Sequence, residues 1–145
     1  MTENEHLPRF YDTELPISAF ITKKLVGIDN DSSVQEAAKK MNDFNISSLV
    51  VMEEGDIVGF LTEGDIRTKV VARGIKPDIP VKDIMSRDLI TVDLGTSVED
   101  AAMKMADHGI KHLLVTEEDE ISGILSFRDL IDIERQNIET HISRE

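Results

Sequence analysis

The stretch Ser33-Val34-Gln35-Glu36-Ala37-Ala38 decides the fold, because a near copy of it, Ser97-Val98-Glu99-Asp100-Ala101-Ala102, begins at 97 instead of 33, an offset of 64 positions. When this offset is kept without a gap, about half of the positions from 33 to 66 are identical to their counterparts. Among them, Met41 falls on Met105, Gly59 on Gly123 and Asp65 on Asp129. Ungapped agreement of this length does not arise by chance, so the chain contains one structural unit twice.

Each copy shows the pattern strand, helix, strand, strand, helix. A short apolar stretch at 25–28, repeated at 89–92, leads into a helix whose apolar positions have the spacing i, i+3, i+4, i+7. Two runs rich in β-branched residues and leucine follow at 48–52 and 57–61, and the polar turn 53–56 between them predicts a hairpin. The helical stripes consist of Val34, Ala37, Ala38 and Met41 in the first copy and Val98, Ala101, Ala102 and Met105 in the second.

Capping signals mark the ends of the first helix in each copy. Ser32-x-x-Gln35 and Thr96-x-x-Glu99 have the spacing of a capping box. Asn45 and Gly109 stand where a left-handed residue closes a helix. These signals predict that both helices span about three turns and end just before the hairpin.

The order of elements predicts an α/β (α+β) chain made of two β-α-β-β-α repeats. Repeat 1 is expected at 16–71 and repeat 2 at 81–132, with a linker at 72–80 in which Gly74, Pro77 and Pro80 prevent a continuous helix. The segments 1–15 and 133–145 are expected to be polar extensions.

Composition restricts the kind of function. The 145 residues include 16 Lys and Arg against 29 Asp and Glu, a formal net charge of −13, and no cysteine. The absence of cysteine excludes disulfides, thiolate metal sites and thiol nucleophiles. The acidic excess argues against nucleic acid or an anionic membrane as the partner, and no apolar run is long enough to span a bilayer or form a secretory signal. We therefore expect a cytoplasmic protein.

The sharpest local feature is the junction between each hairpin and the second helix. Both copies have the order glycine, two apolar residues, a hydroxyl, two variable residues and aspartate, as Gly59 to Asp65 and as Gly123 to Asp129. One interpretation is a capping box, in which the hydroxyl and the carboxylate satisfy the first backbone N–H groups of a helix. The other is a ligand site, because a helix N-terminus suits a phosphate and a nearby carboxylate can accept hydrogen bonds from ribose hydroxyls. Spacing alone favours the capping box slightly.

The duplicated unit and its closing motif resemble a tandem pair of CBS domains, named after cystathionine β-synthase. The resemblance covers roughly residues 16 to 132 and is specific, because motif, order and repeat spacing agree twice. It implies two repeats in a pseudo-twofold arrangement, packed through their sheets. It also implies two clefts that bind adenosine ligands such as AMP, ADP, ATP or S-adenosylmethionine, without a metal or a covalent catalyst.

The resemblance also assigns roles to residues of this chain. It implies that Asp65 and Asp129 hold ribose hydroxyls and that Thr62 and Ser126 lie at the phosphate. The positions expected to flank adenine or to face the cleft are Phe60, Ile124, Ile46, Ile110, Thr22 and Ser86.

The two copies differ where a phosphate would need positive charge. Repeat 2 has Lys111 and His112 where repeat 1 has Ser47 and Ser48, and Arg128 where repeat 1 has Gly64. In one member of the CBS family, the regulatory γ subunit of AMP-activated kinase, residues at these places of one repeat supply cations for a nucleotide whose ribose is held by the aspartate of the other repeat. The resemblance therefore implies unequal sites, with the Asp65 cleft tighter for charged nucleotides. The alternative is that Lys111 and Arg128 are solvated surface cations and that His112 is a residue of an edge strand.

Three functional hypotheses follow. The first is a regulatory module that binds an adenine nucleotide, with or without Mg²⁺, and signals to a separate effector protein. The second is a scaffold for dimerisation with no physiological nucleotide, and the third, an enzyme, has no supporting arrangement of nucleophile, base and acid. The resemblance implies a homodimer through the second helices at 63–71 and 127–134. Their apolar positions Ile66, Val70, Leu130 and Ile133 are expected to share the interface.

Overall fold

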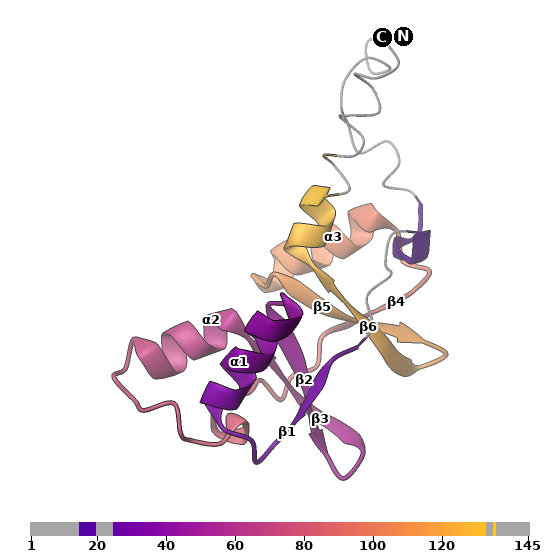
Figure 1. Ribbon diagram of the computed structural model, residues 1–145. Coiled ribbons are helices and arrows are strands. Elements are labelled where there is room, and N and C mark those ends of the chain that lie inside the picture. Colours follow the sequence, from indigo (N-terminus) through magenta and orange to yellow (C-terminus); the bar gives the residue numbers. More distant parts are fainter. Residues whose placement is uncertain (1–14, 20–24, 133–134, 136–145) are drawn as a thin grey trace, which may run out of the picture. The chain divides into compact units, whose positions relative to one another are not determined.

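The computed structural model describes residues 15–19, 25–132 and 135, and these residues form two compact units (Figure 1). One unit is Leu25–Leu89. The other combines residues from Ile90 onward with the short segment 15–19. Thr22, Ile133 and nearly all of the two polar extensions lie outside the described residues.

The 25–89 unit contains a three-stranded sheet with the order β1-β2-β3. Strand β1 (Gly27–Asp29) pairs parallel with β2 (Ser48–Glu53), and β2 pairs antiparallel with β3 (Asp56–Thr62). Helix α1 (Val34–Phe44) connects β1 to β2, as a parallel pair requires. Helix α2 (Glu63–Ile66) follows β3 and continues as a π-helical turn, η4 (Arg67–Val71), and a 3-10 turn, η5 (Val81–Asp83), comes later.

The second unit repeats this plan. Strands β4 (Thr91–Asp93), β5 (His112–Glu117) and β6 (Glu120–Ser126) form a sheet in that order, and helix α3 (Val98–His108) connects the parallel pair. Residues 127–132 are helical, and a 3-10 turn, η3 (Ile17–Ala19), precedes the unit in sequence. The predicted α+β chain with two β-α-β-β-α repeats is confirmed.

The hydrophobic core of each unit lies between the sheet and its helices. In the 25–89 unit, Leu49, Val51 and Leu61 point from the sheet toward Val34 and Met41 of α1. Their counterparts in the other unit are Leu113, Val115, Leu125, Val98 and Met105. Leu49 and Val51 alternate with Val50 along β2, so the period-2 pattern places these two on the helix side of the sheet. Val50, which is also buried, lies on the opposite face.

The N-caps differ from the predicted ones by one residue. The Ser33 hydroxyl accepts from the Glu36 N–H at 3.0 Å, and the Ser97 hydroxyl accepts from the Asp100 N–H at 3.0 Å. The predictions of Ser32 and Thr96 are therefore wrong, because the backbone turns helical only after the second hydroxyl residue. The left-handed C-caps at Asn45 (φ 53°) and Gly109 (φ 62°) are confirmed.

Each unit includes a short segment that leads into the other sequence repeat. In the 25–89 unit, Val34 donates its N–H to Ile79 O at 2.9 Å and Val81 donates to Ser32 O at 2.8 Å. In the other unit, Ile17 donates to Thr96 O at 2.8 Å and Val98 donates to Leu15 O at 3.1 Å. The segment that opens repeat 2 thus covers the helix start of repeat 1, and the segment that opens repeat 1 covers the helix start of repeat 2.

The predicted apolar face of the second helices is turned inward. Val70 and Leu130 are buried in the cores of their own units, and Ile66 packs partly against the first core. The expected interface through Ile66, Val70 and Leu130 is therefore wrong. Helical periodicity identifies an apolar face but cannot tell a core from a partner. The large apolar side chains that stay exposed on these helices are Val71, Phe127 and Ile131.

Candidate functional site

The motif of repeat 1 is built where β3 passes into α2. The Thr62 hydroxyl accepts from the Asp65 N–H at 3.2 Å, and Asp65 Oδ2 accepts from the Thr62 N–H at 3.0 Å and from the Thr62 hydroxyl at 3.2 Å. This reciprocal pair is a complete capping box. The structural interpretation of Thr62 and Asp65, a capping box, is therefore confirmed.

The motif of repeat 2 has the same geometry at the end of β6. Ser126 donates its N–H to Asp129 Oδ2 at 2.8 Å, and the Asp129 N–H donates to the Ser126 hydroxyl at 3.2 Å. Both motifs are also hydrogen-bonded to the residue that directly precedes the first strand of the hairpin. Glu63 donates its N–H to Ser47 O at 3.0 Å, and Phe127 donates to Lys111 O at 2.7 Å.

The structure brings two predicted site residues, Phe60 of repeat 1 and Ser86 of repeat 2, together within the 25–89 unit. Ser86 and Phe60 exchange two backbone hydrogen bonds of 2.8 and 2.9 Å, although 26 positions separate them in sequence (60 to 86). Ser86 therefore lies beside β3, two residues from Thr62 in the strand register. Ile46 instead lines a separate depression of about 300 Å³ between α1 and the second helix, together with Glu63 and Val71.

Gly59 explains how Ser86 reaches this place. A Cβ on Gly59 would lie 2.8 Å from Met85 Cγ, closer than real Cβ atoms approach other atoms, and 3.1 Å from Ser86 O, a tight contact with backbone. The motif glycine is therefore required because the chain at 85–86 runs directly against it. The sequence shows the glycine but not this reason, since the partner segment is distant in the chain.

In the second unit the three predicted cations lie close to their own motif. His112 is opposite Ser126 in the β5–β6 register, and Lys111 is the residue whose carbonyl binds the Phe127 N–H. Lys111 and Arg128 are exposed, while His112 is half-buried. In repeat 1, Ser48 is opposite Thr62, where repeat 2 has His112. The first motif has a cation of its own, because the Lys69 ammonium lies 3.1 Å from Asp65 Oδ1. Unequal affinity of the two sites stays a prediction.

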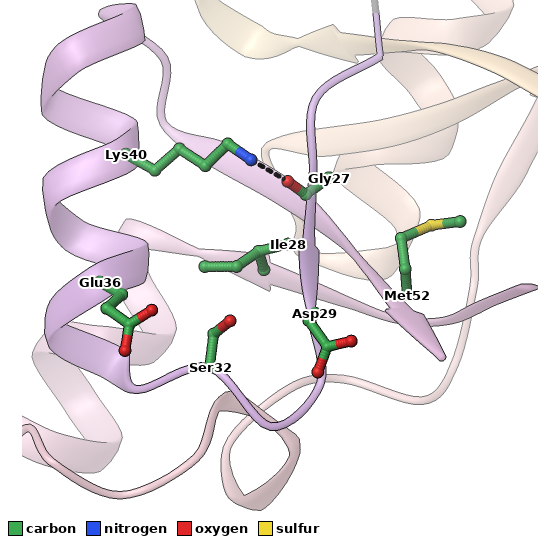
Figure 2. Close-up of a pocket in the computed structure, with 7 residues that line it drawn as sticks. All are labelled: Gly27, Ile28, Asp29, Ser32, Glu36, Lys40 and Met52. Carbon is green, nitrogen blue, oxygen red and sulfur yellow. Dashed lines mark hydrogen bonds between the residues drawn. The ribbon is translucent and has the colours of Figure 1, made fainter. Parts of the chain in front are cut away.

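A pocket of about 500 Å³ lies elsewhere, at the outer edge of β1 (Figure 2). Its lining comes from β1, α1 and β2, and the Lys40 ammonium donates to Gly27 O at 2.5 Å. Lys104 makes the same contact with Thr91 O at 2.5 Å in the other unit. None of the predicted ligand residues lines this pocket, whose walls are Gly27, Ile28, Asp29, Ser32, Glu36, Lys40 and Met52.

Metal ligation and membrane insertion find no support in the part of the chain that the structure describes. No group of three His, Asp or Glu side chains there is placed to hold a metal ion. Within the same residues, no helix is long and apolar enough to cross a membrane.

Comparison with known proteins identifies the family. The CBS domain model matches residues 17–72 and again 81–135. The chain is 32% identical over 110 residues to the CBS domain-containing protein YhcV of Bacillus subtilis, a match that covers 76% of this chain and 79% of that protein. The chain therefore belongs to the CBS-domain family and carries two CBS domains, which together form a regulatory ligand-binding module.

Solved structures agree with this assignment. An uncharacterized conserved protein of Pyrococcus horikoshii is 44% identical with a TM-score of 0.81, over 86% of this chain and 95% of that one. The CBS domain protein PAE2072 of Pyrobaculum aerophilum, solved in complex with AMP, is 26% identical with a TM-score of 0.74, over 87% and 99%. The CBS domain pair of protein MJ0100, also 26% identical with a TM-score of 0.74 over 83% and 96%, was solved with 5′-methylthioadenosine and S-adenosyl-L-methionine.

Proposed function

We propose that the protein binds an adenine nucleotide through its two Gly-h-h-Thr/Ser-x-x-Asp motifs and transmits the occupancy of these sites to a separate effector protein. The observation that carries the proposal is the similarity to PAE2072, which spans nearly all of a chain solved with AMP. The identical geometry of the two motifs in this chain supports it. The proposed role is non-catalytic, and the ligand binds with or without Mg²⁺.

Each motif supplies groups suited to one part of the nucleotide. Asp65 and Asp129 are half-buried carboxylates that can accept hydrogen bonds from ribose hydroxyls. Thr62 and Ser126 stand at helix starts, where the side-chain hydroxyl and the positive end of the aligned peptide dipoles favour phosphate. The N–H groups of Glu63 and Asp65 are already bonded, to Ser47 O and to the Thr62 hydroxyl. Adenine is proposed to contact the apolar and small side chains Phe60, Ile46, Ile124, Ile110, Thr22 and Ser86.

Positive charge favours a phosphorylated ligand over S-adenosylmethionine. Lys111, His112 and Arg128 gather around the motif of the second unit, and charge-assisted hydrogen bonds to phosphate contribute about 1.5–3 kcal/mol each. S-adenosylmethionine carries no phosphate and offers these groups only its single carboxylate, so it gains less from them. S-adenosylmethionine and methylthioadenosine are the second candidate ligands for this chain, because the similar protein MJ0100 was solved with both.

The test is a thermal-shift panel with AMP, ADP, ATP, S-adenosylmethionine and NAD, followed by calorimetry. A ligand at 100 times its Kd adds about 2.7 kcal/mol of stability, which raises Tm by roughly 5–10 °C in a protein of this size. Asp65→Asn should weaken the binding of AMP. No shift with any ligand would contradict the proposal and favour a scaffold without a physiological nucleotide.

The control separates ligand binding from helix capping. Because Asp65 completes a capping box, its substitution lowers stability even without ligand. Ser33→Ala removes the cap of α1, which costs about 1 kcal/mol and leaves the motif untouched. Retention of the AMP shift in Ser33→Ala, with its loss in Asp65→Asn, supports the proposal.

We further propose a cytoplasmic homodimer as the working form. Phe127 and Ile131 are 47% and 45% exposed and are spaced i, i+4, so they share one face of the helix after β6. An apolar pair of this kind on a strongly acidic chain is typical of an interaction surface.

A further inference from the structure

The Asp65 carboxylate is almost fully used before any ligand arrives. Oδ2 accepts from the Thr62 N–H and hydroxyl, and Oδ1 forms an ion pair with Lys69 Nζ at 3.1 Å. The Asp65 side chain is 17% exposed. A carboxylate offers about four acceptor positions, so three are occupied and one remains.

Lys69 has a second partner, which comes from a distant segment. Its ammonium donates to Ile84 O at 2.9 Å. Ile84 is buried, and the residues that follow it are Met85, which fills the space beside Gly59, and Ser86, which pairs with Phe60. One ammonium group thus joins the motif carboxylate to the segment that brings Ser86 to the site.

The lysine has no counterpart at the same position of repeat 2. The position that corresponds to Lys69 is Ile133, whose side chain has no donor. Lys69 is therefore one of the residues that differ between the two repeats near their motifs. Repeat 1 has this lysine and lacks the three cations at the positions of Lys111, His112 and Arg128.

We propose that Lys69 is a positioning residue of the first motif, which clamps Asp65 Oδ1 to Ile84 O. The clamp leaves a single acceptor position of Asp65 for the ligand, so the carboxylate binds one ribose hydroxyl instead of both. It also holds the backbone of 84–86 against β3. The statement about ribose rests on the proposed function, whereas the statement about the segment does not.

The first experiment needs no ligand. Amide hydrogen exchange at Ser86 reports whether its bond to Phe60 O stays closed, and Lys69→Met should raise the exchange rate at least about 5-fold. Lys69→Arg, which can bridge a carboxylate and a carbonyl with its forked donors, should restore the slow rate. Lys76→Met, an exposed lysine nearby, is the matched control. Equal exchange in the wild type and Lys69→Met would overturn the clamp.

The second experiment compares AMP with 2′-deoxy-AMP and 3′-deoxy-AMP by calorimetry, in an Asp129→Asn background that weakens the other site. With Lys69 present, removal of one hydroxyl should cost about 10-fold in Kd and removal of the other less than 2-fold, because a hydrogen bond to a charged group contributes at least about 1.5 kcal/mol. In Lys69→Met both removals should cost about 10-fold.

The outcomes separate the two proposals. If the wild type loses affinity for both deoxy analogues, or if Lys69→Met keeps the wild-type pattern, the role of Lys69 in hydroxyl selection is wrong while nucleotide binding stands. If AMP does not bind at all, the proposed function is wrong, and hydrogen exchange at Ser86 alone decides whether Lys69 holds the segment.

Discussion

At Gly59 the missing side chain allows two distant parts of the chain to meet. Met85 is buried against this glycine, and Ser86 is hydrogen-bonded to the next residue of β3. The motif glycine is thus needed for packing as well as being part of the family motif. Its role depends on Met85 and Ser86, which lie outside the motif.

Gly59→Ala should lower the free energy of unfolding by about 1–3 kcal/mol, the usual cost of forcing a methyl group into a filled space. Gly64→Ala is the control, because a Cβ there meets its nearest neighbour, the Thr62 hydroxyl, at an ordinary 3.5 Å. Urea unfolding of both variants checks the difference. Equal stability of Gly59→Ala and wild type would show that the 85–86 segment does not lie against β3.

At the scale of elements, β1 and β4 stand at the edges of their sheets, where unpaired backbone groups invite other strands. Lys40 and Lys104 occupy one such group each, the carbonyls of Gly27 and Thr91. The same lysine-to-edge contact occurs in both repeats at the offset of 64 positions (40 to 104). Both repeats have therefore kept a lysine that covers an edge carbonyl, one on β1 and one on β4. The pocket in Figure 2 is the space beside β1.

The double substitution Lys40→Met and Lys104→Met should promote association through the exposed edges. We expect larger species to appear by light scattering as the protein concentration rises, because the edge carbonyls lose their donors and the charges that oppose strand addition. Lys39→Met, an exposed lysine on the same helix, is the control. An unchanged size distribution of the double variant would mean that the two lysines are dispensable for edge protection.

Taken over the whole chain, the segment that opens each repeat packs in the unit formed mainly by the other repeat. Each sequence repeat is therefore divided between both units. Ile17 is fully buried in the core of the second unit, and Val81, its counterpart in repeat 2, is fully buried in the 25–89 unit. Stability of the second unit consequently depends on the residues that open repeat 1. A truncation that removes the first 19 residues would remove part of this core.

Ile17→Ala should reduce the free energy of unfolding by about 2–5 kcal/mol, the range for deleting most of a buried aliphatic side chain. Ser18→Ala is the control, because Ser18 is exposed and its contact with Leu94 O at 3.3 Å uses only the backbone. Thermal and urea unfolding measure the effect. A wild-type stability for Ile17→Ala would contradict the exchange of segments.

The proposed homodimer gives the last prediction. We expect wild type to have twice the 16.2 kDa chain mass by light scattering. The double substitution Phe127→Glu and Ile131→Lys should yield monomers with little loss of monomer stability, because both side chains are exposed. A monomeric wild type would make the homodimer prediction wrong, and a dimeric double variant would place the interface elsewhere.

The repeat, the order of elements and the hairpins could all be predicted from the sequence, because helix and strand periodicity and turn residues act over a few neighbouring positions. It also located the two motifs and their capping residues, for which the interacting groups lie three positions apart. The family resemblance added the ligand class, which remains a proposal for this chain.

The meeting of distant residues became visible only in the folded chain. The inward orientation of Val70, the approach of Met85 to Gly59 and the bond of Lys69 to Ile84 O depend on partners many positions away. Local patterns carry no information on such pairs, since an apolar face can cover its own core or a partner, and a lysine can be solvated or clamped. The physical reason is that burial and pairing are properties of the packed chain, in which segments 15–19 and 79–86 complete cores that their own sequence repeats do not contain.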